Sequence, residues 1–133
     1  MAGETDINTL LSGLTPQLLN DTYVFCTLPD GVYGDYAMTR PIASFQEVEG
    51  LTLVMTQGNA DAQSLVYDGL FCCISLQIHS SLQAVGLTAV VSGKLAEADI
   101  SANIIAGYYH DHLFVPHAKV VEALEILNNI NNP

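Results

Sequence analysis

The chain has 133 residues, of which half are apolar and 13% are charged, and its formal net charge at pH 7 is −11. This length fits one compact domain or two very small ones, and the apolar content excludes disorder and suffices for a core. Fourteen Asp and Glu residues against three Lys and Arg residues give a surface that repels phosphate backbones and anionic lipid. No nucleic acid and no membrane is therefore expected as a partner.

The first half of the chain begins with a predicted helix and strand. Residues 6–14 predict a short helix, because their leucines recur at helical spacing. Residues 22–28 are rich in β-branched and aromatic side chains, which favours a strand. Residues 29–36 contain Asp30-Gly31 and Gly34, so they predict a loop.

A hairpin and a second short helix are expected next. Residues 41–48 and 51–56 read as two strands, and Glu49-Gly50 between them is suited to the turn. Asn59 has the side chain of a helix cap and predicts a helix that runs to about residue 66. The first half thus has the predicted order α-β-β-β-α.

The clearest strand of the sequence covers residues 71–79. Ile74, Leu76 and Ile78 share one face, whereas the residues between them give a mixed face. This pattern suits a sheet covered by helices on one side, whose other face is solvated or packed on a partner. A helix over about residues 82–98 follows, with the apolar stripe Leu87, Val90, Val91, Leu95 and Ala98.

Two strands and a last helix complete the second half. Residues 101–108 and 112–115 predict strands joined by a turn at 109–111, and Pro116 suits the first turn of the final helix. The Asn-rich residues 128–133 predict a frayed tail. The apolar face of the final helix is expected at Val120, Val121, Leu124 and Leu127.

The order β-α-β-β-α in the second half is that of a ferredoxin-like fold that lacks its last strand. Six strands are expected in all, fewer than two complete units would need. We therefore expect an α+β fold, in which a βαββα unit over residues 69–133 packs with a smaller, incomplete unit over residues 1–68. Either one unit is incomplete or the two halves exchange strands. Because no Gly/Ser/Pro-rich linker separates them, they should pack as one body.

The sequence carries features of a cytoplasmic protein. Its first 14 residues lack a signal-peptide pattern, and no apolar run reaches the roughly 20 residues of a membrane span. Cys26, Cys72 and Cys73 lie in strand-like apolar runs. Buried, reduced thiols account for this pattern better than a disulfide framework or a metal site does.

Residues 85–104 (VGLTAVVSGKLAEADISANI) resemble the signature of ACT domains. That signature has a Pro-Gly turn that opens a helix, a Leu-Ala-Glu-Ala-like helix end and an Ile-Asn-Ile-like strand. Val85 stands where the signature has proline, and Ser101-Ala102 is inserted before Asn103. The resemblance implies a ferredoxin-like ACT fold.

Four further stretches are similar to a bacterial group of stand-alone ACT proteins of unassigned function. They are YVFC at 23–26, MTRPIA at 38–43, HSSL at 79–82 and GYYHDHLFVP at 107–116. A more distant likeness is to the tandem-ACT arginine sensors of animal growth signalling. The resemblance implies paired modules, side-by-side sheets and ligands held at module interfaces.

The loop from Ser80 to Gly86 is the candidate ligand site. It leads into a helix N-terminus, where backbone N–H groups without partners and the helix dipole favour a carboxylate. Gly86 has no Cβ, so a ligand can approach the backbone closely. Alternatively, Ser81 only caps the helix and Gly86 packs it on the sheet. The candidate ligand-binding residues are Ser80, Ser81, Leu82, Val85, Gly86 and Asn103.

Other polar residues are weaker candidates. Asp99 and Asp111 are either partners for a ligand's amino group or solvated loop residues. His110 and His112 lie two apart on extended chain and point to the same side, but a zinc site needs three or four ligands. His79 or His117 would complete one only if the fold brought it close. We therefore expect no metal and no cofactor.

Arg40, the sole arginine, either pairs with a carboxylate within the fold or clamps an acidic ligand through two hydrogen bonds. The chain contains no G-x-S-x-G elbow and no P-loop, so no enzyme is expected. The expected function is a regulatory protein that binds a small molecule, possibly an amino acid, and forms a homodimer or higher oligomer. The alternative is an ACT module for protein interaction or structure, with no ligand.

Overall fold

The computed structural model describes residue 11 and residues 13–76 and 86–130. Most of the predicted first helix, residues 77–79 of the fourth predicted strand and residues 80–85 of the candidate loop lie outside this part. The strands are β1 (Pro16–Leu28), β2 (Ala43–Glu47), β3 (Gly50–Thr56), β4 (Phe71–Leu76), β5 (Asn103–Ala106) and β6 (Asp111–Pro116). The helices are α2 (Gln57–Ala62), α3 (Leu87–Glu97) and α4 (Val120–Asn128), with 3-10 turns η1 (Ala37–Thr39) and η2 (His117–Lys119). The α+β fold class is confirmed.

The chain forms two compact units. Unit 2 comprises residues 21–71, and unit 1 comprises residues 1–20 together with residues 72–133. β1 therefore contributes its first five residues to unit 1 and the rest to unit 2. The domain boundary expected after residue 68 stays a prediction. What the structure adds is that the described residues before Asp21 belong to the same unit as the C-terminal part of the chain, so the chain order and the spatial units differ.

Unit 2 contains the antiparallel order β2-β3-β1, with Tyr23 opposite Thr56 and Leu28 opposite Leu51. Glu47 pairs with Gly50, so the hairpin turn is Val48-Glu49, one residue earlier than the sequence predicts. Gly50 has φ of +145°, and a Cβ there would clash with the Leu28 carbonyl oxygen. Gly50 therefore begins β3 instead of ending the turn. The core of this unit consists of Val24, Cys26, Leu51, Leu53, Met55 and Ala60.

The start of α2 differs from the prediction that Asn59 caps it. Thr56 is the cap residue, and its Oγ1 accepts a hydrogen bond from the Asn59 N–H at 3.2 Å. Because Thr56 ends β3 in an extended conformation, its hydroxyl reaches the first turn of the helix. Asn59 instead donates its Nδ2 to the Thr39 carbonyl oxygen at 2.9 Å. The helix ends at Ala62, four residues earlier than expected.

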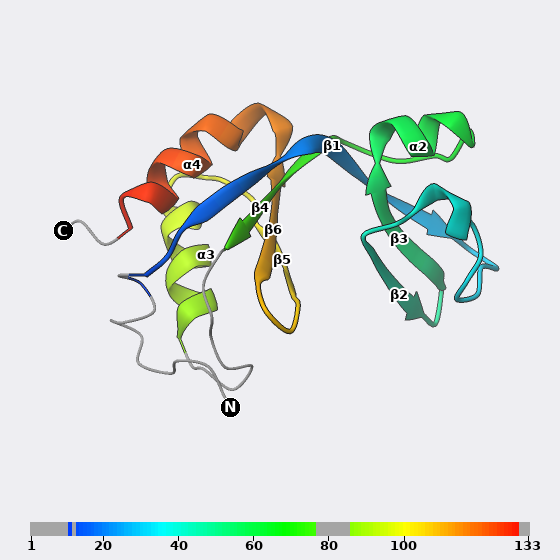
Figure 1. Ribbon diagram of the computed structural model, residues 1–133, viewed down its shortest axis with the longest axis horizontal. Helices are drawn as coiled ribbons and strands as arrows, with labels where there is room; N and C mark the ends of the chain where they lie inside the picture. Colours follow the sequence, from blue (N-terminus) through cyan, green and yellow to red (C-terminus); the bar gives the residue numbers. More distant parts are fainter. Residues whose placement is uncertain (1–10, 12, 77–85, 131–133) are drawn as a thin grey trace. The chain divides into compact units, whose positions relative to one another are not determined.

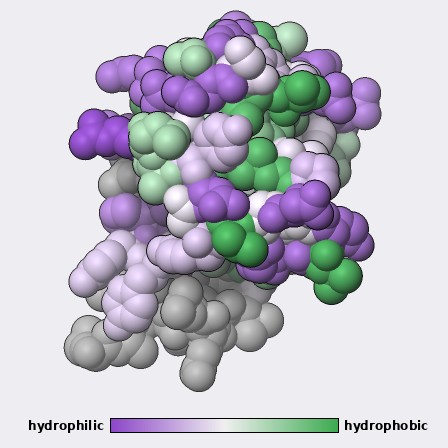
Figure 2. Space-filling view, turned by 90° about the vertical axis from the view of Figure 1, so that its right-hand side faces the viewer, coloured by the Kyte–Doolittle hydropathy of each residue, from purple (hydrophilic) through white to green (hydrophobic). Residues whose placement is uncertain are grey.

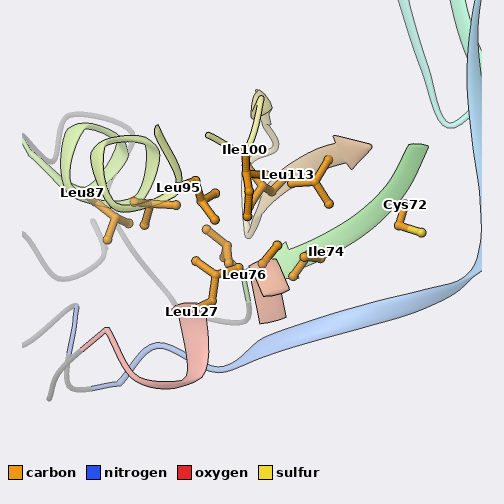
Figure 3. Packing of buried hydrophobic residues seen from close by; sticks show 11 residues of the cluster. Cys72, Ile74, Leu76, Leu87, Leu95, Ile100, Leu113 and Leu127 are labelled. Carbon is orange, nitrogen blue, oxygen red and sulfur yellow. The ribbon is translucent and has the colours of Figure 1, made fainter. Parts of the chain in front are cut away.

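Unit 1 has the strand order β1-β4-β6-β5, and α3 and α4 lie on the same side of these strands (Figure 1). Side chains from both helices and from β4 and β6 meet between these layers (Figure 3). Leu11 and Leu14 pack against this cluster, which fits the apolar spacing near the N-terminus. The buried members are Cys72, Ile74, Leu76, Leu87, Val91, Leu95, Ile100, Leu113, Val115, Ala123 and Leu127.

β4 is buried on both faces. Ile74 and Leu76 face the helices, as predicted, but Cys73 is 0% exposed and Ser75 only 4% exposed. The alternative of a solvated second face is therefore wrong. β4 lies between β1 and β6, a central position in which both strand edges are also paired. Among the described residues, no helix is both long and apolar enough to cross a bilayer.

The last helix turns most of its predicted apolar face to the core, with one exception. Pro116 ends β6, and the 3-10 turn η2 precedes α4, so the register of the helix is shifted. Ala123 and Leu127 are buried, whereas Val121 is 69% exposed. The prediction of Val121 in the apolar face is wrong. Val120 and Leu124 are partly buried against the core, as expected.

Leu127 and Val121 provide a matched test of this register. Leu127→Ala should lower the free energy of unfolding by about 2–5 kcal/mol, because it leaves a cavity among buried side chains. Val121→Ala removes exposed atoms from the same helix and should change it by less than about 0.5 kcal/mol. Urea unfolding of both variants checks this. Equal losses would contradict the register of α4.

Candidate functional site

Gly86 is the residue of the candidate loop that the structure describes; Ser80, Ser81, Leu82 and Val85 lie outside the described residues. Gly86 is the N-cap of α3, with φ of 99° and ψ of −21°. L-residues with a Cβ rarely adopt this left-handed conformation, so the turn into α3 requires glycine. As a glycine, Gly86 has no side chain with which to cap the helix.

The N-terminus of α3 has backbone N–H groups that the helix itself does not pair. The first helical bond runs from the Val90 N–H to the Gly86 carbonyl oxygen at 2.9 Å. The N–H groups that come before Val90 in the first turn of α3 have no partner within the helix. The first turn contains no acidic side chain that would neutralise the positive end of the helix dipole, and Lys94 lies in the last turn. Such an end favours a carboxylate or another anion.

Asn103 begins β5 and is exposed, opposite Phe114 on β6. Its neighbour Ile104 packs against the core that the helices cover, so Asn103 lies on the other face of the sheet. Its grouping with the candidate loop stays a prediction, because the loop residues 80–85 are outside the described part.

The His110–His112 segment forms the end of a turn and the start of a strand. The Gly107 N–H donates to the His110 carbonyl oxygen at 2.9 Å, so the turn spans 107–110 instead of the expected 109–111. The Nδ1 of His112 lies 3.3 Å from the Ile105 carbonyl oxygen. Within the part of the chain that the structure describes, no three His, Cys, Asp or Glu side chains form a metal-binding group.

Asp99 has a structural position rather than a place beside Gly86. It follows α3 with φ of +60°, and its N–H donates to the Ala96 carbonyl oxygen at 2.9 Å. The Ile100 N–H then bonds the Leu95 carbonyl oxygen at 3.0 Å. Asp99 thus ends the helix in the way that a left-handed residue commonly does.

Arg40 is exposed and makes no ion pair with any described carboxylate, so the expectation of a partner within the fold is not met there. It lines a surface hollow of unit 2 together with Tyr33, Asp35 and Ser44. The lone arginine was the only signal of this hollow in the sequence. Figure 2 shows the side of the molecule that is on the right in Figure 1, and on this side hydrophobic and hydrophilic residues are mixed.

Two ACT-domain models match the chain, one over residues 2–73 and the other over residues 71–129. The chain belongs to the ACT-domain family. This confirms the resemblance inferred from the signature at residues 85–104. A search of curated protein sequences found no significant match.

Solved structures similar to this ACT-domain protein include one from Vibrio cholerae, a protein of unknown function described as a possible transport protein. It is 47% identical, with a TM-score of 0.86 over 94% of this chain and 95% of that chain. The ligand-free regulatory subunit of aspartate kinase from Thermus thermophilus is 11% identical, with a TM-score of 0.59 over 88% of this chain and 97% of that chain. E. coli aspartokinase III in complex with aspartate and ADP is 13% identical, with a TM-score of 0.62 over 91% of this chain and 33% of that chain. The two aspartokinase likenesses show the fold alone.

The three cysteines of this ACT-domain protein are free and buried, as predicted. Burial raises the pKa of the Cys26 and Cys72 thiols. Burial and, to a smaller extent, the neighbouring Cys72 raise the pKa of the Cys73 thiol to about 11. Because the thiolate is the reactive form, these thiols are poor nucleophiles at neutral pH.

The half-buried Asp111 provides a test of how partial burial of a charge affects stability. Burial raises the pKa of Asp111, and His112 opposes this rise. As pH rises, the unfolded chain releases this proton before the folded protein does, so Asp111 destabilises the fold above its folded pKa. Asp111→Asn should therefore be more stable than the wild type at pH 7, and the advantage should shrink as pH falls through the carboxyl range. Urea unfolding across this range checks the sign. A variant that is less stable at pH 7 would contradict it.

Proposed function

We propose that this ACT-domain protein is a regulatory protein that binds an amino acid or a similar small carboxylate and catalyses no reaction. The observation that carries the proposal is the N-terminus of α3, where Gly86 adopts a left-handed conformation and no acidic side chain occupies the first turn. Backbone N–H groups are the natural carboxylate ligands in a chain with only three Lys and Arg residues.

The proposed mode of binding places the ligand carboxylate on the first N–H groups of α3. A hydrogen bond to a charged group contributes about 1.5–3 kcal/mol, so two such bonds give useful affinity for a small metabolite. The missing Cβ of Gly86 leaves room for the ligand backbone. Ser80, Ser81, Leu82, Val85 and Asn103 remain the predicted further contacts.

Regulation follows if the ligand binds one state of the protein better than another. A ligand that prefers the folded or assembled state stabilises that state by mass action. The fold shared with the aspartate kinase regulatory subunit from Thermus thermophilus supports a regulatory role. The buried cysteine thiols, with their raised pKa values, fit a protein without a cysteine nucleophile.

A glycine pair in and beside α3 tests the site once a thermal-shift screen of the standard amino acids has identified a ligand. Gly86→Ala should weaken binding by about 1–3 kcal/mol, because the methyl group obstructs the approach to the N–H groups. It should also lower stability by about 1–2 kcal/mol, because φ is positive there. Isothermal titration of the folded variant measures the affinity.

Gly93→Ala is the matched control. It adds the same methyl group within the same helix, where a Cβ meets nothing within 4 Å. It should raise stability by up to about 1 kcal/mol and leave affinity unchanged. If Gly86→Ala binds as tightly as Gly93→Ala does, the ligand is not held at this helix end. If no amino acid raises the melting temperature, the alternative of an interaction module without a ligand is favoured.

We further propose that the protein is a homodimer. β2 and β5 lie at the two ends of the strand order, and each pairs along one edge only within the described residues. Edge strands with exposed apolar side chains favour pairing with another chain, and Phe45 on β2 is 70% exposed. Light scattering at micromolar concentration should give twice the mass of the chain. A monomer under these conditions would exclude a stable dimer.

A further inference from the structure

The surface of unit 2 contains a hollow of about 580 Å³, within the roughly 300–1,000 Å³ typical of small-molecule sites. Its lining combines one cation, one carboxylate, a tyrosine and a serine with short apolar side chains. All of its lining residues belong to unit 2. They are Tyr33, Gly34, Asp35, Ala37, Arg40, Pro41, Ile42, Ala43, Ser44 and Leu53.

Arg40 is the unusual member of this lining. It is the single Lys or Arg of residues 21–71, a stretch that contains seven Asp and Glu residues. Despite this excess of carboxylates, its guanidinium makes no ion pair within the described part of the chain. A guanidinium matches a carboxylate through two parallel hydrogen bonds, and here that capacity remains unused beside a hollow.

The backbone that carries Arg40 is held in a strained conformation. Tyr36 and Arg40 flank η1, and both are left-handed, with φ of 59° and 52°. The residue before a proline is normally extended, so Arg40 before Pro41 is strained for a second reason. Buried Thr39 fixes this segment: its Oγ1 donates to the Tyr36 carbonyl oxygen at 2.6 Å, and its carbonyl oxygen accepts from the Asn59 Nδ2 at 2.9 Å. The backbone from which the Arg40 side chain extends is therefore preorganised.

Tyr33 and Asp35, which also line the hollow, belong to a segment that side-chain hydrogen bonds fix. Gln46 accepts from the Tyr33 N–H and donates to the Gly31 carbonyl oxygen, each at 3.0 Å. Asp35 accepts from the Val32 N–H through its Oδ2, also at 3.0 Å. A carboxylate has further lone pairs, so Asp35 can also accept hydrogen bonds from an ammonium group in the hollow.

We propose that this hollow, which we call the Arg40 pocket, binds an α-amino acid with a short aliphatic side chain. The ligand carboxylate pairs with Arg40, and its ammonium group pairs with Asp35. The aliphatic side chain lies against the apolar lining, such as Pro41, Ile42 and Leu53. This site shares no residue with the candidate site at Gly86, so it stands or fails independently of the function proposed above.

L-leucine titrated into the full-length protein, with amide NMR as the readout, tests the proposal. Saturable shifts should concentrate on residues 33–44. Arg40→Gln should weaken this binding on the order of tenfold or more, the equivalent of a lost charged hydrogen bond. Arg40→Lys should restore part of it, because the charge remains but the planar fork is lost. Lys119→Gln, which removes the same charge from an exposed position of unit 1, should leave the affinity unchanged.

Isocaproate, which is leucine without its ammonium group, distinguishes an amino acid from a simple carboxylate. It should bind more weakly than L-leucine does, and Asp35→Asn should weaken the binding of L-leucine but not that of isocaproate. Equal binding of the two would overturn the assignment of an amino acid. The assignment of the pocket would be overturned if L-leucine shifted no amide signals of residues 33–44. It would also be overturned if Arg40→Gln bound L-leucine with the affinity of the wild type. Gly86→Ala should leave these shifts unchanged, so failure of one site is distinguishable from failure of the other.

Discussion

The shared strand β1 constrains most of this structure. A single run of 13 residues supplies strand pairing in both units, so the boundary between the units falls within β1 and unit 1 is discontinuous in sequence. In unit 2, the register of Tyr23 opposite Thr56 fixes β3 and, through the hairpin, β2. That register places Leu53 and Ser44 in the lining of the Arg40 pocket. In unit 1, β1 precedes β4 in the strand order, and the chain returns from β4 to the N-terminus of α3.

The scarcity of basic residues decides how this protein can recognise a carboxylate. With a net charge of −11, the chain disfavours anions at most of its surface. Two local features oppose this general repulsion. One is the N-terminus of α3, where backbone dipoles supply the positive potential, and the other is Arg40, which no described carboxylate neutralises. Both features offer directional hydrogen-bond donors, which suit a small carboxylate better than a polyanion.

Left-handed backbone occurs at both candidate sites. Gly86 makes the turn into α3, whereas Tyr36 and Arg40 flank η1 without being glycine. At Gly86, the absence of a Cβ gives access to the backbone. At Arg40, the side chain is needed, and the hydrogen bonds of Thr39 hold a conformation that the sequence alone disfavours. The two candidate sites thus present hydrogen-bond donors on an acidic surface in different ways, one through backbone N–H groups and the other through a guanidinium group.

The order of apolar and turn residues determined much of the fold. Alternation at Ile74 and Leu76 and the helical spacing of Leu87, Val91 and Leu95 are local patterns, so they predicted β4, α3 and the helix-covered face. The ACT signature at 85–104 predicted that Gly86 lies in the turn that opens α3. Tertiary structure decided what depends on distant partners: burial of Cys73 on a second face, the exposure of Val121 after η2, and the union of residues 13–20 with the C-terminal unit. The lining residues 33–44 of the Arg40 pocket are neighbours in sequence, and the pairing of Ser44 with Leu53 in the hairpin added Leu53 to them.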